Sequence, residues 1–210
     1  VTGVQTCALP ICLCGSRILV DERIYDTFLE RFIEKVSKIK IGRPEDTETE
    51  YGSVISSQHL EKILSYIQLA KQEGGTIVAG GNRVTEIDGQ TTNGCFVEPT
   101  VITGLSINSR CATEEIFGPV VTVHKFESDE EAIKMANCTQ YGLAGSVWSK
   151  GRGREVAEQI ESGMVWVNTW LHRDLRVPFG GVKDSGVGRE GGMWSLGFFS
   201  EAVNICVMED

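Results

Sequence analysis

The sequence predicts an α/β fold in which a mostly parallel sheet is covered by helices on both faces. Segments with the apolar spacing of amphipathic helices alternate along the chain with short segments rich in β-branched residues. These short segments are almost continuously apolar, which is typical of parallel strands that are buried on both faces. A chain of 210 residues can form one sizeable core, or one domain with an added lobe.

Four segments are predicted to form helices. They are residues 23–39, 59–75, 128–140 and 154–162. In the first of them, apolar residues recur every three or four positions and form a single face. Ser128 and Glu131 have the spacing of a capping box, which marks the start of a helix, and Gly163 follows the last segment as a stop signal.

Seven segments are predicted to form strands. They are residues 16–22, 76–81, 96–104, 119–128, 143–149, 164–168 and 202–208. The last one, AVNICVM, has no later segment to pair with, so we expect it to join a sheet elsewhere or in another subunit. A glycine-rich segment without any period, residues 170–192, precedes it. Ordered loops of this length are uncommon unless they are functional.

Composition disfavours several classes of protein. The chain has 20 Lys and Arg against 29 Asp and Glu, a net charge of −9, and its basic residues do not cluster, which disfavours nucleic acid or an anionic membrane as the main partner. No apolar run has the roughly 18 to 20 residues that a membrane span needs. The seven cysteines are an odd number spread through predicted core elements, so we expect free thiols in a reducing compartment, the cytoplasm.

Two local patterns resemble site signatures without meeting their requirements. Cys7, Cys12 and Cys14 lack the paired C-x2-C spacing of a structural zinc site, so no metal site is expected. The segment GVGREG, residues 186–191, matches G-x-G-x-x-G, but no predicted strand precedes it and no acidic residue stands in the right context behind it. We therefore expect these glycines to let a tight loop turn and pack closely, rather than to bind a dinucleotide.

Three motifs, in order and with matching spacing, resemble the aldehyde dehydrogenase superfamily. They are ICLCGSR followed by a strand and an amphipathic helix, TEEIFGPVVTV, and VWVN followed by PFGGVKDSGVGRE. The likeness runs from about Cys12 to the C-terminus. It implies the catalytic domain of that family with a C-terminal oligomerisation strand, a homo-oligomeric full-length protein, a small-molecule aldehyde as substrate, and NAD or NADP as cofactor, with NAD favoured.

The resemblance implies that Cys12 is the catalytic nucleophile. In the family this cysteine stands five residues before the arginine of the Gly-Ser-Arg motif, which here is Arg17. A thiolate is soft and partly ionised, as attack on an aldehyde requires, and the backbone N–H of Cys12 would donate to the oxyanion. A cysteine is more often a small buried apolar residue, so the agreement of all three motifs is what favours the nucleophile.

In the second motif the resemblance assigns Glu115 to the hydroxyls of the nicotinamide ribose and Phe117 to packing beside the nicotinamide. A carboxylate can accept from two hydroxyl donors, and an aromatic face can confine a ring, so both residue types suit these tasks. Taken without the other motifs, Glu115 would be an acid at a helix start and Phe117 a core residue.

The segment before PFGG indicates what kind of substrate to expect. Arg173 stands where many family members have an apolar or aromatic residue, and a guanidinium offers a fork for a carboxylate. RDLR-x-PFGG with NICV looks like the branch that oxidises 2-aminomuconic and 2-hydroxymuconic semialdehydes, so Arg173 is the expected carboxylate anchor and Phe179 is expected to line the aldehyde tunnel. For Arg173 and Arg176 alike, a solvated salt bridge to Asp174 or Glu190 is the alternative.

The resemblance also predicts how the chain divides. Residues 1–11, VTGVQTCALPI, resemble the translation of a sequencing-adapter oligonucleotide and are expected to be a non-native leader; they have no charge and are broken by Pro10, so they do not form a secretory signal. Residues 12–185 are expected to be the catalytic domain, and residues 186–210 the tail with the oligomerisation strand. The family's nucleotide-binding domain, its oxyanion-hole asparagine and its general-base glutamate are expected upstream and absent here, so the chain alone is expected to be inactive.

Two other functions remain as alternatives. One is a non-catalytic oligomerisation or scaffold module of the same fold, although such a module would not require Cys12, Glu115 and Phe117 together. The other is a thiol hydrolase in which Cys12 acts with His59 or His172, which requires one of these histidines within hydrogen-bond reach of the thiol.

Overall fold

A computed structural model of the chain describes residues 3–6 and 15–209. Its main feature is a seven-stranded sheet with the order β10-β9-β1-β2-β7-β6-β3. The strands are β1 (Gly3–Thr6), β2 (Arg17–Asp21), β3 (Thr76–Ala79), β6 (Thr100–Thr103), β7 (Val120–Phe126), β9 (Ala144–Trp148) and β10 (Met164–Val167).

Most strands of this sheet run in one direction. β2, β7 and β6 pair in parallel, and so do β9 and β10. β1 is antiparallel to both β2 and β9, and β3 is antiparallel to β6. Since β1 is antiparallel to both of its neighbours, β2 and β9 are parallel to each other, so only β1 and β3 oppose the rest. The predicted mostly parallel sheet is confirmed.

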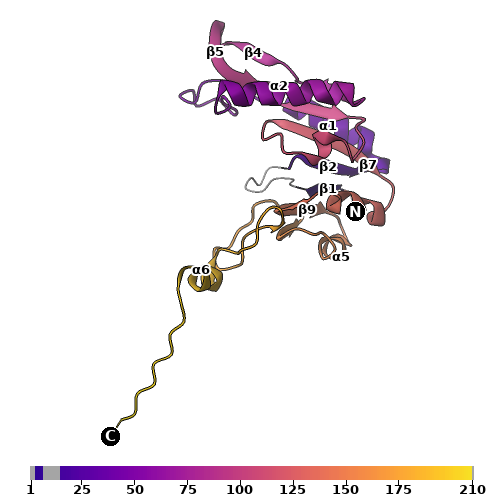
Figure 1. Cartoon of the computed structure of the whole chain (residues 1–210). Coiled ribbons are helices and arrows are strands. Elements are labelled where there is room, and N and C mark those ends of the chain that lie inside the picture. Colours follow the sequence, from indigo (N-terminus) through magenta and orange to yellow (C-terminus); the bar gives the residue numbers. More distant parts are fainter. Residues whose placement is uncertain (1–2, 7–14, 210) are drawn as a thin grey trace.

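Helices cover both faces of the sheet (Figure 1). They are the short 3-10 helix η1 (Glu22–Ile24), α1 (Tyr25–Val36), α2 (Ser57–Gln72), α3 (Arg110–Thr113), α4 (Asp129–Asn137), α5 (Gly153–Ala157) and α6 (Gly192–Phe199). Along β2, Val20 packs in the cluster formed with α1, whereas Leu19 packs with residues of α4 and α5. Along β6, Val101 faces α1 and Ile102 faces α2. Neighbouring residues of a strand point to opposite faces, so α1 covers one face and α2, α4 and α5 cover the other.

The capping box predicted at the start of α4 is confirmed, and α2 also begins at a serine cap, whereas α1 and α5 have no side-chain cap. Ser56 Oγ accepts from the N–H of His59 at the start of α2, at 3.2 Å. At α4, Ser128 Oγ accepts from the N–H of Glu131 at 3.2 Å, and the Glu131 carboxylate accepts from the N–H of Glu127 at 2.7 Å. The last predicted helix is shorter than expected, because α5 ends at Ala157 rather than at residue 162.

One predicted strand is divided in the structure and one hairpin was missed, and both differences have a local reason. The predicted strand 96–104 is divided into β5 (Gln90–Val97) and β6, because Pro99 between them has no N–H for a strand ladder. β5 forms a hairpin with β4 (Arg83–Ile87), which the apolar pattern did not predict. The turn of this hairpin is Asp88-Gly89, and both residues have positive φ, 52° and 73°. Asp-Gly is a strong hairpin signal and could have identified the turn.

The glycine-rich segment is ordered by short elements. Strand β11 (Val182–Lys183) pairs with β8 (Tyr141–Gly142), and α6 begins at Gly192. The expectation that no strand precedes GVGREG is therefore wrong. β11 is only two residues long and antiparallel to its partner, so it does not supply the parallel βαβ context that a dinucleotide fingerprint needs.

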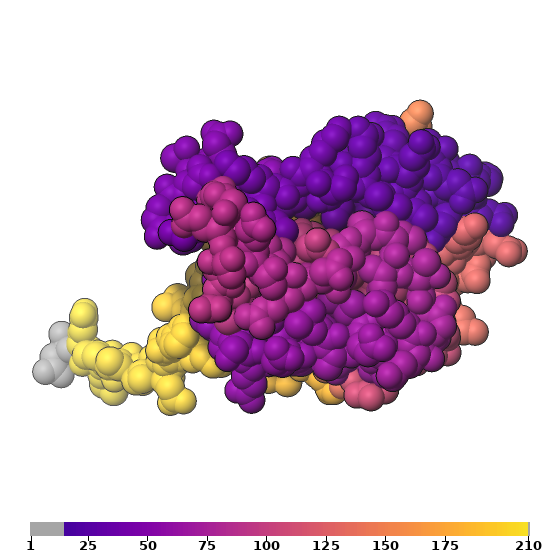
Figure 2. Space-filling view, turned by 90° about the horizontal axis from the view of Figure 1, so that it is seen from above, coloured from indigo at the N-terminus to yellow at the C-terminus, as the bar shows by residue number. Residues whose placement is uncertain are grey.

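The C-terminal segment projects from the body of the molecule (Figures 1 and 2). Residues 201–209 form no strand in this single chain, although 202–208 are predicted to be one. A strand needs a hydrogen-bonding partner, and none of the described residues supplies one to this segment. Large apolar side chains are exposed along α6 and this segment: Met193, Trp194, Leu196, Phe198, Phe199, Val203, Ile205, Val207 and Met208.

Within the part of the chain that the structure describes, no helix is long and apolar enough to cross a membrane. The cysteines of this part, Cys95, Cys111, Cys138 and Cys206, are free thiols. Residues 3–6 form β1, an inner strand of the sheet, although they belong to the expected leader. The assignment of residues 1–11 as non-native stays a prediction.

Candidate active site

The second motif forms a bend between α3 and β7 that leaves Phe117 in an unusual conformation. Phe117 has a φ of 60°, in the left-handed region that a non-glycine residue occupies at a cost of about 1 to 2 kcal/mol. Its side chain is 49% exposed. Such a conformation persists only where the surroundings hold it, and an exposed aromatic ring held in this way is available to contact a bound molecule.

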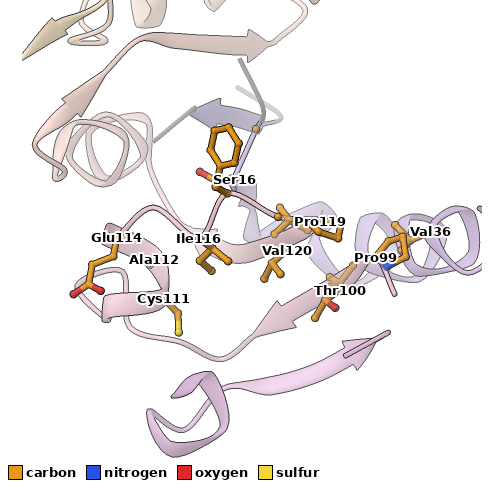
Figure 3. A pocket seen from close by; sticks show the side chains of 15 residues that line it. Ser16, Val36, Pro99, Thr100, Cys111, Ala112, Glu114, Ile116, Pro119 and Val120 are labelled. Atoms are coloured by element: carbon orange, nitrogen blue, oxygen red, sulfur yellow. The ribbon is translucent and has the colours of Figure 1, made fainter. Parts of the chain in front are cut away.

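A cavity of about 240 Å³ lies beside this bend (Figure 3). It is lined by residues from four parts of the sequence, among them Gly15, Ser16, Val36, Thr100, Phe117 and Val120. Cys12 itself lies outside the described residues. Since Gly15 and Ser16 of the first motif line the same cavity as Phe117 of the second, the fold brings these two motifs to one place although they are about one hundred positions apart.

Glu115 is half-buried in the bend, and its side chain is not among those that line the cavity. Its carbonyl oxygen accepts from Lys62 Nζ at 2.8 Å. The neighbouring Glu114 binds Arg110 and the hydroxyl of Tyr66, at 2.7 Å for each of the shortest contacts. These two hydrogen bonds lower the pKa of the Glu114 carboxyl, Arg110 more than Tyr66. Burial and the bond to Glu114 raise the pKa of Tyr66 to about 12.

The side chains of Glu115 and Phe117 have the chemistry that a nicotinamide riboside would need. The exposed ring of Phe117 offers an aromatic face beside a cavity, and the Glu115 carboxylate can accept from two hydroxyls. The assignment of these two residues to the cofactor stays a prediction, and the fit of their chemistry supports it.

Cys111, a thiol that was not singled out from the sequence, lines the cavity. Burial, with a further contribution from Glu73, raises the pKa of Cys111 to about 12. Its Sγ donates to the carbonyl oxygen of Tyr66 at 3.3 Å. A thiol with such a pKa carries almost no thiolate at neutral pH, so Cys111 is a structural residue and not a nucleophile.

Arg17, the arginine from which Cys12 is located, has a structural role. Its side chain is 1% exposed. Its Nη1 donates to the carbonyl oxygen of Met135 and its Nη2 to that of Ala136, both at 2.9 Å. These carbonyls lie near the C-terminal end of α4, where a positive charge stabilises the helix dipole.

His124 is a buried histidine near Arg17. Burial, and next the charge of Arg17, lower the pKa of His124 to about 4, so His124 is neutral at physiological pH.

The structure brings Arg173, Phe179 and Glu190 together in the third motif. The Arg173 guanidinium lies over the Phe179 ring, with 3.9 Å between Cζ and the ring centroid. Its Nη2 donates to Glu190 Oε1 at 2.8 Å. The backbones of Phe179 and Glu190 exchange two hydrogen bonds, both 2.8 Å. The alternative of a partly solvated salt bridge is therefore present for Arg173, and Arg176 is paired with Asp174.

This third group does not line the cavity beside Phe117. Phe179 packs instead against a small core cluster at β9 and β10 that contains Leu143, Ala144 and Met164. His172 contributes its carbonyl oxygen, which accepts from Trp166 Nε1 at 2.9 Å.

Close backbone contacts fix the position of the third motif. The Cβ of any larger residue at Gly163 would overlap the carbonyl oxygen of Gly180. Lys183 Nζ donates to the carbonyl oxygens of Asn137 and Thr139 and pairs with Glu161 at 2.6 Å. The absence of a side chain at Gly163 thus allows the PFGG loop to lie against the start of β10.

The sequence model described as "Aldehyde dehydrogenase family" matches residues 3–205. The chain belongs to the aldehyde dehydrogenase family. Among aldehyde dehydrogenases of known function, the chain is 48% identical to the 2-aminomuconic 6-semialdehyde dehydrogenase of a Pseudomonas species, over 95% of this chain and 41% of that protein. It is 49% identical to the 2-aminomuconic semialdehyde dehydrogenase of Mus musculus, over 94% of this chain and 41% of that protein.

Solved aldehyde dehydrogenase structures share the fold. A betaine aldehyde dehydrogenase of Staphylococcus aureus in complex with NAD+ matches with a TM-score of 0.85 and 46% identity, covering 91% of this chain and 38% of that one. The 2-hydroxymuconic semialdehyde dehydrogenase of Pseudomonas sp. strain CF600 is 46% identical, over 94% of this chain. The chain therefore spans about 41% of the length of the curated aldehyde dehydrogenases it matches.

Proposed function

We propose that the full-length protein containing this chain oxidises a carboxylated semialdehyde of the muconic type to the corresponding acid. The observation that carries the proposal is Arg173, a half-exposed guanidinium held on the third motif, in a chain 46 to 49% identical to three muconic semialdehyde dehydrogenases. A carboxylate at the end of the substrate remote from the aldehyde would accept from such a guanidinium.

The proposed chemistry begins at Cys12. Its thiolate adds to the carbonyl carbon of the aldehyde, and the backbone N–H of Cys12 donates to the oxyanion that forms. The tetrahedral adduct then loses a hydride and becomes a thioester, which water hydrolyses to release the acid and regenerate the thiol. When bound, the nicotinamide cofactor supplies the acceptor for this hydride.

NAD is the favoured cofactor in this proposal. Glu115 would accept from the ribose hydroxyls, and the exposed ring of Phe117 would confine the nicotinamide. The NAD+ complex of the structurally similar betaine aldehyde dehydrogenase supports this choice. The choice between NAD and NADP can be measured directly by comparing kcat/KM for the two in the full-length protein.

A betaine-type aldehyde is the second candidate substrate, because betaine aldehyde dehydrogenases match this chain with 41 to 46% identity. Betaine aldehyde is a cation, and a guanidinium at the substrate entrance would repel it. An assay of the full-length protein with a 2-hydroxymuconic semialdehyde and with betaine aldehyde separates the two: the proposal requires a higher kcat/KM for the former and is wrong if betaine aldehyde is preferred.

Thiol labelling separates an enzyme from a scaffold module of the same fold. In the full-length protein, iodoacetamide is expected to modify Cys12 faster than exposed Cys138, because a nucleophilic cysteine is held partly as thiolate. Cys111 is the internal control, since burial and its pKa of about 12 should make it inert. Equal or slower labelling of Cys12 than of Cys138 would support the scaffold.

The exposed apolar side chains of α6 and residues 201–209 support the further proposal of a homo-oligomer. Phe199, Val203 and Ile205 are each 80% exposed. Exposed apolar surface of this extent is typical of a protein–protein interface. A full-length protein that ends at residue 200 is expected to elute as a smaller species than the wild type in size-exclusion chromatography, and an unchanged elution volume would contradict this.

A further inference from the structure

Helix α2 carries three polar side chains that all contact the bend containing Glu115 and Phe117. They are His59, Lys62 and Tyr66, and their spacing places them along one side of the helix. His59 Nε2 lies 2.5 Å from the carbonyl oxygen of Phe117. Because a carbonyl oxygen can only accept, Nε2 is the protonated nitrogen of His59 in this contact. Lys62 Nζ donates to the carbonyl oxygen of Glu115, and Tyr66 donates to the Glu114 carboxylate.

The same side of α2 also supports the bend by packing. A Cβ on Gly118 would lie 2.6 Å from Cδ1 of Ile63, so the backbone after Phe117 rests directly on the helix. The ring of His59 meets that of Phe117 edge to face, with centroids 5.8 Å apart. Each residue from Glu114 to Gly118 therefore lies against α2, Ile116 through the buried cluster that it shares with Leu60 and Ile63, and the strained Phe117 makes two contacts.

From this arrangement we propose that His59 and Lys62 are positioning residues, which hold residues 114–118 in the strained conformation that presents Phe117 to the cofactor. The proposal rests on the proposed function only in naming the cofactor as the molecule that Phe117 contacts. Its structural part concerns the chain alone: two side chains on α2 fix the carbonyl groups of Glu115 and Phe117 and thereby set the backbone of the bend.

The competing explanation is that His59 and Lys62 stabilise the fold as a whole. The exposure of these two side chains distinguishes this explanation from a role in positioning the bend. Lys62 is exposed and His59 is half-buried, so their hydrogen bonds lie at the surface and contribute little to global stability. The core of α2 is formed instead by Leu60, Ile63, Ile67 and Ala70, which are all buried. Loss of the two donors should therefore loosen the bend while the helix and the sheet remain folded.

The first test measures the bend itself by hydrogen–deuterium exchange of the 210-residue chain. Substitutions His59→Leu and Lys62→Met remove the donors, whereas His59→Gln and Lys62→Arg keep an N–H at a similar position. We expect the donor-free double variant to exchange the amides of Glu114 and Val120, which are hydrogen-bonded at the two ends of the bend, at least tenfold faster. Its thermal midpoint should stay within about 2 °C of the wild type, and the donor-retaining variants should stay near wild type in both measurements. Glu61→Gln, on the same helix but outside these contacts, is the control. Unchanged exchange in the double variant would overturn the proposal.

The second test measures the consequence in the full-length protein. Donor-free variants are expected to lower kcat with NAD about tenfold and to leave the KM of the aldehyde within twofold, while His59→Gln and Lys62→Arg restore most of kcat. If exchange increases but kcat in an active enzyme is unchanged, the bend is held by α2 without any effect on the cofactor, and the positioning role is wrong. If the wild-type protein does not reduce NAD at all, the proposed function fails, and the exchange experiment still decides whether His59 and Lys62 fix the bend.

Discussion

The guanidinium of Arg173 is stacked on the ring of Phe179, with 3.9 Å between Cζ and the ring centroid. Arg173 and Phe179 therefore hold each other in place. Glu190 also fixes the guanidinium by accepting a hydrogen bond from Nη2. A guanidinium has five N–H donors, so the bond to Glu190 leaves the fork able to serve a second carboxylate. The stacking on Phe179 and the bond to Glu190 orient Arg173 before any substrate binds.

Replacing Arg173 by Ala in the full-length protein should lower kcat/KM for a carboxylated semialdehyde by about 10- to 100-fold, because a hydrogen bond between charged groups contributes about 1.5 to 3 kcal/mol. A neutral aldehyde of similar length should be oxidised at nearly the wild-type rate. Arg176→Ala is the matched control, since Arg176 is already paired with Asp174. Equal losses on both aldehydes would show that Arg173 is structural.

Replacing Arg17 by Met should lower the free energy of unfolding by about 3 kcal/mol, because the carbonyl oxygens of Met135 and Ala136 would lose charged donors in a buried place. Urea denaturation of the 210-residue chain measures this. Arg31→Met, on the exposed side of α1, should change the same quantity by no more than about 0.5 kcal/mol. A loss at position 17 as small as that at position 31 would contradict the structural role of Arg17.

The free energy of unfolding should decrease as the pH is lowered below about 6.5, and His124 is the cause. Its pKa is lowered from 6.5 to about 4 in the folded chain, mainly by burial. Between these values the unfolded chain binds the proton and the folded chain does not, so stability is fully present above pH 6.5 and decreases until pH reaches about 4. The shift corresponds to about 3 kcal/mol. His124→Asn should make the urea midpoint depend less on pH between pH 7 and pH 4. If the midpoint of this variant falls with pH as steeply as that of the wild type, His124 is not the cause.

Replacing Gly163 by Ala should displace the third motif, because the new Cβ would overlap the carbonyl oxygen of Gly180. A backbone shift of this kind costs about 1 to 3 kcal/mol, and misplacement of the loop should also reduce the activity of the full-length protein. Gly151→Ala is the control, since nothing lies within 4 Å of a Cβ at that position. Wild-type thermal stability and activity in both variants would show that the loop does not depend on this contact.

The 210-residue chain alone should not bind NAD with micromolar affinity. Glu115 and Phe117 supply the only contacts assigned to the cofactor in this chain, and two contacts do not offset the loss of freedom of the bound molecule. Isothermal titration calorimetry with NAD should therefore give no measurable heat of binding at micromolar concentrations, whereas the full-length protein should bind. Micromolar binding to the 210-residue chain would refute this expectation.

Much of the fold could be predicted from the sequence because its signals are local. The apolar period of α1 and α2 and the capping residues Ser56 and Ser128 act over three or four positions, and the four predicted helices are present with shifted ends. The missed boundaries also have local causes, such as Pro99 between β5 and β6. The helices assigned to 128–140 and 154–162 end early, since periodicity does not show where packing stops.

The sequence by itself determined the family and supplied the residues proposed for its chemistry, because motif spacing around Arg17, Glu115 and Phe117 is a property of the linear chain. Only the tertiary structure decided what surrounds these residues. Arg17 donates to a carbonyl 119 positions away, and His59 holds a carbonyl 58 positions away. Contacts between such distant positions leave no periodic pattern, because they form where separate strands and helices of the folded chain meet.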